Sequence, residues 1–150
     1  MKTRSRIGIL LMVAVMAVSG GILTACTKDE ADAKLLENSQ TLVVIEANAT
    51  GGSMKDAMAK LKGAGDLDYE GSEGEFGFYL TSVNGYTPNA AKNEFWAVYT
   101  TLGEYDGVTY SNVEYGTYEY DGKTLASAAY GISGLPLIKG HLYILTVSTY

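Results

Sequence analysis

The sequence is poor in the residues on which many catalytic and metal-binding sites depend. Its 150 residues include one cysteine and one histidine. One cysteine cannot close an internal disulfide or build a cysteine-based zinc site. Only His141 could serve as the base of a nucleophile–histidine pair, and no Gly-x-Ser-x-Gly, P-loop or dinucleotide-binding motif is present. We therefore expect a protein that is not an enzyme; catalysis would require His141 or a pair of acids in a closed pocket.

Proline and net positive charge are also scarce. Two prolines beside 18 glycines and 12 tyrosines are a poor fit to collagen, a coiled coil or bulk disorder. A formal net charge of −6 argues against a nucleic-acid partner, because such partners need a cationic face. The length indicates one compact domain.

The N-terminal residues differ from the rest of the chain. Basic residues within 1–6 precede an apolar run over 7–18, which is short for a membrane span of about 20 residues. Small residues then lead to Cys26, and this pattern resembles a bacterial lipoprotein signal, in which the cysteine is lipidated and becomes the new N-terminus. We expect residues 1–25 to be a signal peptide and Cys26 to be the lipidation site. The alternative is an ordinary secretory signal or membrane anchor with a free thiol.

Loss of the signal would change the charge balance. Removing residues 1–25 takes away three of the 11 basic residues and none of the 17 acidic ones, which leaves a net charge of −9 and no arginine. This surface repels anionic headgroups, so the lipid would supply the attachment to the cell membrane, with the domain on its extracytoplasmic side. Residues 26–40 are polar and are predicted to be a tether, within which 31–37 could form a helical turn or two.

The remaining residues, 41–150, are predicted to form an α+β domain. Ser53 and Asp56 have the spacing of a capping box, which predicts a helix over 53–62 whose apolar stripe faces the core. Apolar and β-branched residues predict strands over 41–47, 76–81, 95–102 and 141–148. Tight turns are predicted at Asn84-Gly85, Asp106-Gly107 and Asp121-Gly122.

No metal site is expected. Residues 66–71 match the start of a calcium-binding loop if Glu70 is accepted as its third ligand. The twelfth position should be a glutamate, but it is Gly77, and the residues that follow predict a strand rather than a helix. Residues 66–75 are therefore predicted to be a solvated acidic loop.

Aromatic residues are abundant beyond Cys26. Tyrosine combines a rigid apolar ring with a polar tip, which suits amphipathic ligands and protein partners. Cross-strand pairing on an exposed sheet face is the alternative explanation, and it suits Tyr105, Tyr110, Tyr115, Tyr118 and Tyr120. The better ligand candidates flank the Asn84-Gly85 turn and its return strand; they are Tyr79, Tyr86, Trp96 and Tyr99.

Residues 77–85 (GFYLTSVNG), followed by Glu94-Phe95-Trp96, resemble the small C-terminal β-domain of transcobalamin and intrinsic factor. The helix with its Ser-x-x-Asp start and the final glycine turn and strand over 140–147 are similar as well. Bacterial lipoproteins that carry this domain alone form a family of undetermined function. The resemblance covers about residues 41–150, with 103–134 expanded.

The resemblance implies a β-grasp-like fold, with one helix on a mostly antiparallel or mixed sheet. It also implies a site for cobalamin, a related corrinoid or another amphipathic ligand. In transcobalamin the β-domain closes over a ligand that lies largely on a separate helical domain, and the expected mature length leaves no room for that domain. Half a site binds weakly unless a partner supplies the other wall. The residues at matching motif positions near the expected ligand face are Leu80, Ser82 and Trp96.

Two functions follow as expectations. The first is a membrane-anchored ligand-binding lipoprotein that captures a corrinoid or other amphipathic ligand and passes it to an uptake system. The alternative is a non-catalytic interaction or adhesion module on the cell surface whose tyrosine-rich face binds protein. A concave pocket beside the Asn84-Gly85 turn would favour the first function, and a broad exposed aromatic patch without a cleft would favour the second.

Overall fold

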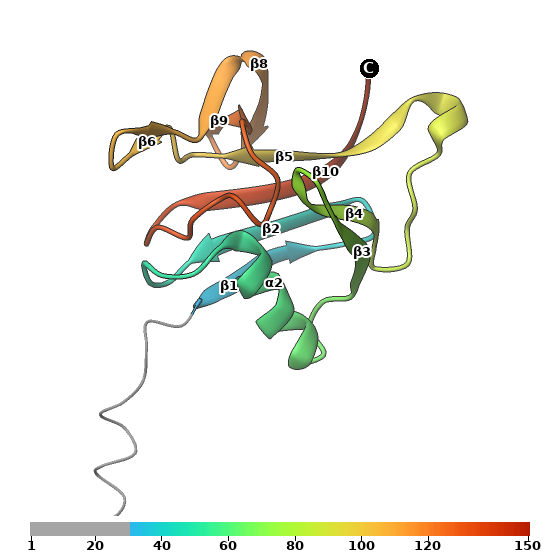
Figure 1. Cartoon of the computed structure of the whole chain (residues 1–150), viewed down its shortest axis with the longest axis horizontal. Helices are drawn as coiled ribbons and strands as arrows, with labels where there is room; N and C mark the ends of the chain where they lie inside the picture. The colour runs from blue at the N-terminus through green and yellow to red at the C-terminus, as the bar shows by residue number, and fades with distance from the viewer. Residues whose placement is uncertain (1–30) are drawn as a thin grey trace, which may run out of the picture.

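The computed structural model describes residues 31–150. Their largest element is a six-stranded antiparallel sheet (Figure 1). The predicted signal peptide and Cys26 lie outside the described residues. In spatial order the strands of this sheet are β1 (Ala33–Asn38), β2 (Leu42–Ala47), β10 (Leu142–Thr149), β5 (Glu94–Thr100), β9 (Lys123–Ala128) and β8 (Ser111–Tyr120). The structure therefore confirms a mostly β, α+β architecture, and β10 lies inside the sheet between β2 and β5.

One α-helix is present in the described residues, and it begins where the capping box predicts. α2 spans Met54–Gly63, after the N-cap Ser53. The Asp56 N–H donates to Ser53 Oγ over 3.2 Å, and the Ser53 N–H donates back to the Asp56 carboxylate over 2.8 Å. Two donors that the helix start leaves without partners are thereby satisfied. Met54, Ala57 and Met58 are buried, as their spacing predicts.

The predicted tether is wrong over the residues of β1. Ala33–Asn38 pairs with β2, from Ala33 opposite Ala47 to Asn38 opposite Val43. No helical turn forms there. Ala33 and Leu35 pack against the core while the intervening Lys34 stays exposed. The polar composition is that of an edge strand, which meets water on one face and along one edge.

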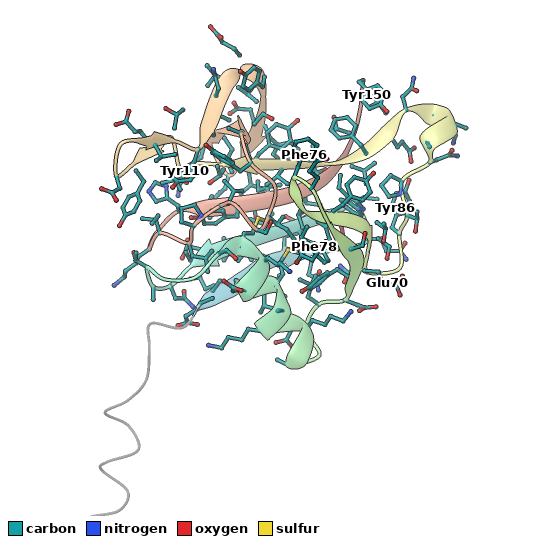
Figure 2. All side chains as sticks on the ribbon, in the orientation of Figure 1. Glu70, Phe76, Phe78, Tyr86, Tyr110 and Tyr150 are labelled. Carbon is teal, nitrogen blue, oxygen red and sulfur yellow. The ribbon has the colours of Figure 1, made fainter. Side chains whose placement is uncertain are left out.

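The predicted acidic loop is also wrong in part. Residues Tyr69–Gly74 form β3, which pairs with β4 (Gly77–Val83) in a separate two-stranded hairpin. Tyr69 is buried, and a solvated loop would not bury it. Phe76 begins the strand predicted over 76–81, but it precedes β4 and lies at the hairpin tip with 96% of its surface exposed (Figure 2).

The main core lies between the sheet and a second layer made of α2 and the β3–β4 hairpin (Figure 1). Because side chains alternate across a strand, the other face of the sheet carries a smaller buried cluster. Its members are Val44, Leu125, Leu142 and Ile144.

The two Asp-Gly turns behave as predicted. Asp106 and Gly107 join β6 (Glu104–Tyr105) to β7 (Val108–Thr109), while Asp121 and Gly122 join β8 to β9. All four residues have positive φ, between 48° and 78°, as type I′ turns require. Asn84 and Gly85 also have positive φ, but they lead into a loop containing the short 3-10 helix η1 (Ala90–Lys92) before β5 begins.

Candidate functional site

An apolar groove of about 200 Å³ lies between β4, β5 and the loop after β9. It brings together three of the predicted ligand residues, namely Tyr79, Leu80 and Trp96. The other lining residues are Phe78, Phe95, Val98, Gly131 and Ile132. Tyr79 lines the groove although 69% of its surface is exposed. The groove offers flat apolar walls and few polar groups, the usual composition of a small-molecule site.

The indole of Trp96, which forms one wall of the groove, carries a buried polar atom without a partner. Its Nε1 is buried and has no hydrogen-bond partner. An indole N–H can only donate, and a buried donor without an acceptor is destabilising.

The Trp96 ring is held in place by a neighbouring loop. Tyr86 meets the indole edge to face, with 6.2 Å between ring centroids. The Tyr86 hydroxyl donates to Glu94 Oε2 over 2.8 Å, and the Asn89 N–H donates to the same oxygen over 2.8 Å. The Asn89 N–H, followed by the Tyr86 hydroxyl, lowers the pKa of Glu94. The bond to Glu94 is the main cause of the raised pKa of Tyr86.

This arrangement assigns Tyr86 and Glu94 a positioning role. Tyr86 does not line the groove, but it contacts the residue that does. Glu94 was not predicted as a functional residue, although the Glu-Phe-Trp motif contained it. Its acceptor role depends on Asn89, which reaches it only because η1 turns the chain back.

The third wall comes from residues far along the chain. Ser133 Oγ accepts a hydrogen bond from the Phe78 N–H of β4 over 3.1 Å. The Ile132 carbonyl accepts from the Lys55 N–H in the first turn of α2 over 3.0 Å. These two bonds fix 131–133 against both β4 and α2. No local pattern in residues 131–133 indicates a binding wall.

Two predicted ligand residues lie elsewhere. Ser82 is buried opposite Glu70 in the β3–β4 hairpin and does not line the groove. Tyr99 packs with the smaller cluster on the opposite face of the sheet, where its ring lies 5.5 Å from that of Tyr118. Neighbouring residues in one strand need not share a face: Trp96 and Val98 pack against the main core, and Tyr99 packs against the smaller cluster.

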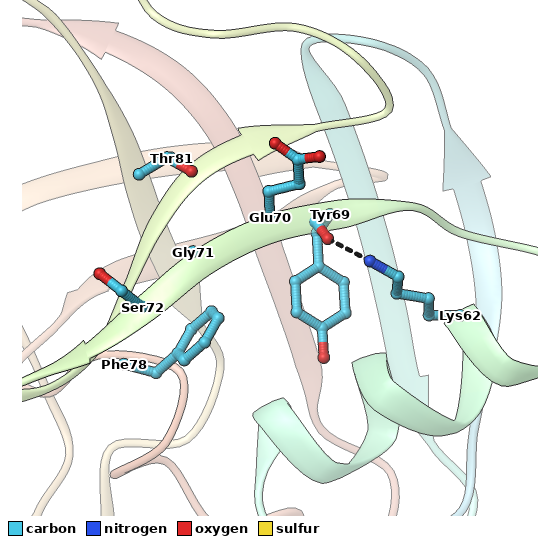
Figure 3. A pocket seen from close by; sticks show the side chains of 7 residues that line it. All are labelled: Lys62, Tyr69, Glu70, Gly71, Ser72, Phe78 and Thr81. Atoms are coloured by element: carbon cyan, nitrogen blue, oxygen red, sulfur yellow. Dashed lines mark hydrogen bonds between the residues drawn. The ribbon is translucent and has the colours of Figure 1, made fainter.

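A second, more open hollow of about 550 Å³ lies where the end of α2 meets the β3–β4 hairpin (Figure 3). Lys62 Nζ donates to the Tyr69 carbonyl over 2.5 Å and lies 3.1 Å from the Asp68 carboxylate. The lysine is therefore already partnered and is a weak candidate for binding an anion. The hollow is lined by Lys62, Tyr69, Glu70, Gly71, Ser72, Phe78 and Thr81.

His141, the one candidate catalytic base, contacts Thr101 and joins two strands. Its Nδ1 lies 3.0 Å from Thr101 Oγ1, which also accepts from the Leu142 N–H over 3.0 Å. These bonds join the start of β10 to the end of β5, and His141 lines neither hollow described above. Within residues 31–150, no group of three or more His, Cys, Asp or Glu side chains is placed to hold a metal ion.

Over residues 31–150, no helix is both long enough and apolar enough to cross a membrane. Comparison of the chain with protein-family models, curated proteins and solved structures finds no match.

Proposed function

We propose that this protein is a lipid-anchored, extracytoplasmic ligand-binding protein whose groove between β4 and β5 receives an apolar or amphipathic ligand. The observation that carries the proposal is the apolar groove itself, one wall of which is Trp96 with a buried Nε1 that lacks an acceptor. A ligand with a flat apolar part and one acceptor atom would match both features.

The ligand class in this proposal is a corrinoid, such as cobalamin, or another amphipathic molecule of that kind. The support is the resemblance of residues 77–85 and 94–96 to the transcobalamin β-domain. The groove, at about 200 Å³, is smaller than a typical pocket for a whole small molecule, which is roughly 300–1,000 Å³. It would therefore hold one edge of a corrinoid, and an uptake protein would supply the opposite wall.

A β-grasp-like fold is the finer part of the same proposal. Its support is the order of the elements: the β1–β2 hairpin leads directly into α2, and the last strand, β10, lies beside β2 in the sheet.

Ligand binding can be tested by equilibrium dialysis of the full chain in detergent micelles against cobalamin and cobinamide. We expect a dissociation constant below the millimolar range for at least one of them. Trp96→Phe keeps a ring but removes the donor, so it should weaken binding about tenfold, the effect of one hydrogen bond of about 1.4 kcal/mol. Tyr99→Phe, on the opposite face, is the matched control. If neither compound binds at millimolar concentration, the corrinoid is rejected as the ligand class.

The membrane anchor is proposed from the signal-like pattern before Cys26 and the small residues that precede it. Metabolic labelling with a radioactive fatty acid should label the full chain, and Cys26→Ser should remove both the label and the recovery in the membrane fraction. Label retained by the Cys26→Ser variant would contradict lipidation at this residue.

The second candidate function is protein binding at the end of the molecule formed by the two Asp-Gly hairpins. Between Asn112 and Thr117 the pairing of β8 with β9 is interrupted. Within that interruption Val113 is 63% exposed and Tyr115 is 71% exposed. Loss of surface attachment in Tyr115→Ser but not in Trp96→Phe would favour this function over ligand binding.

A further inference from the structure

Part of β5 has an open edge in the middle of the sheet. β5 pairs with β9 only at Tyr99 and Thr100, so no strand among residues 31–150 pairs with the stretch Glu94–Val98 on that side. β9 ends at Ala128, after which 131–133 bonds to β4 and α2 instead. The chain thus leaves the sheet before it can cover the first part of β5.

The main-chain groups on this edge point outward. The Thr101 N–H donates to the Leu142 carbonyl of β10 over 3.2 Å. In an antiparallel pair these bonds fall on alternate residues, so the N–H and C=O groups of Trp96 and Val98 face away from β10. The Glu94 N–H is already bonded to the Asn89 carbonyl over 3.1 Å, which closes one end of the open stretch.

The outer edges of the sheet carry protective features that this stretch lacks. β1 has the charged Lys34 and a register irregularity after Leu35, and β8 breaks its pairing over several residues. Charges and bulges of this kind normally prevent a strand edge from pairing with another chain. Glu94–Val98 contains no proline, lysine or bulge, and its register with β10 is continuous. Its one charged group, the Glu94 carboxylate, lies at the closed end and is bonded to Tyr86 and Asn89.

We propose that the Glu94–Val98 edge of β5 docks an extended, basic segment of a partner protein, which adds a strand to the sheet. Only a polypeptide main chain supplies donors and acceptors at the spacing of the open Trp96 and Val98 groups. The adjoining groove of about 200 Å³ suits one apolar side chain of that segment. This inference shares a groove with the proposed ligand site but does not depend on the identity of a small molecule.

Charge complementarity selects a basic segment. Beyond residue 25 the chain has a net charge of −9 and no arginine. Such a field speeds the approach of a cationic segment and repels an acidic one, most strongly at low salt. Basic residues at the two ends of the segment and apolar residues at its centre therefore fit this edge best.

The test uses the full chain in detergent micelles and the probe heptapeptide Lys-Thr-Val-Leu-Val-Thr-Lys. Hydrogen exchange of the Trp96 and Val98 amides, followed by NMR, should slow at least tenfold when the peptide is bound. The same peptide with proline at its centre should not bind, because it lacks a main-chain donor and breaks the strand. A variant peptide with glutamate in place of both lysines should bind at least tenfold more weakly at low salt.

Several outcomes would overturn the inference. These are absence of binding at millimolar peptide, protection confined to the edges of β1 or β8, equal binding of the proline peptide, and protection of Trp96 by self-association of the chain without peptide. Dialysis against cobinamide on the same sample keeps the two proposals separate. Cobinamide binding without peptide binding overturns the docking edge alone, and peptide binding without cobinamide binding rejects the corrinoid alone.

Discussion

Tyr143 joins the central strand to the segment that precedes it. The ring is fully buried, and its hydroxyl donates to the Pro136 carbonyl over 2.6 Å and accepts from the Ile138 N–H over 2.9 Å. Tyr143→Phe keeps the ring but leaves both backbone groups without a partner. We expect the free energy of unfolding to fall by about 1–3 kcal/mol, measured by urea denaturation. The exposed Tyr150→Phe is the control, and equal stability of the two variants would contradict this role.

The same residue predicts a loss of stability at high pH. Burial raises the pKa of Tyr143 to about 12, from an ordinary value of 10.0. The unfolded chain therefore releases this proton first, so stability is unaffected well below pH 10 and falls as the pH rises from 10 to about 12. The melting temperature should decline over this interval, and it should decline less in Tyr143→Phe. A variant with an unchanged slope would show that other groups cause the decline.

Glu94 predicts a change at low pH, with the opposite sign. The folded structure lowers the pKa of Glu94 from its ordinary value of 4.5. Its contribution to stability is therefore fully present above pH 4.5 and is lost as the pH falls through the lower pKa of the folded state. Protonation weakens the bonds from Asn89 and Tyr86, and Tyr86 then releases the Trp96 ring. The emission of Trp96, the only tryptophan in the chain, should change below this pH. Glu94→Gln should show the altered emission at neutral pH and no acid transition; an acid transition retained by Glu94→Gln would place the titrating group elsewhere.

At the scale of the element, the hairpins depend on backbone conformations that few residues adopt. Gly122 has φ +74° in the turn between β8 and β9, whereas Gly103 lies in open space without a positive φ. Gly122→Ala should destabilise the protein by about 1–2 kcal/mol, because a Cβ disfavours the left-handed region. Gly103→Ala, the matched control, should have little effect. Equal melting temperatures for the two variants would show that the turn tolerates a different geometry.

For the whole molecule, β1 moves the start of the folded domain ahead of the boundary predicted at residue 41. Ala31 is buried, and Ala33 and Leu35 pack against the main core. A chain of residues 41–150 would lose these contacts and expose the edge of β2. Compared with residues 31–150, its free energy of unfolding should fall by about 2–3 kcal/mol, the effect of burying one large apolar side chain. Chemical denaturation of both chains measures the difference, and equal stability would restore a boundary near residue 41.

The predictable features are those whose cause lies within a few residues. Ser53 and Asp56 are one helical turn apart and satisfy each other's donors. The Asp121-Gly122 turn follows from the conformations open to those two residues. Tyr79, Leu80 and Trp96, which the motifs over 77–85 and 94–96 contain, line one groove.

The unpredicted features depend on partners that are distant in the chain. Ser133 meets Phe78 across 55 positions, and Ala33 pairs with Ala47 only because β2 presents a free edge. The sequence by itself determined the capped helix and the tight turns, because each is stabilised by its own neighbours, and the apolar run over 141–148 indicated a strand. Tertiary structure alone decided which face Tyr99 occupies, which loop forms the third wall of the groove, and which part of β5 stays open. These outcomes depend on which strands and loops form backbone hydrogen bonds with one another. Such pairing involves segments that are distant in the chain, so no short segment specifies it.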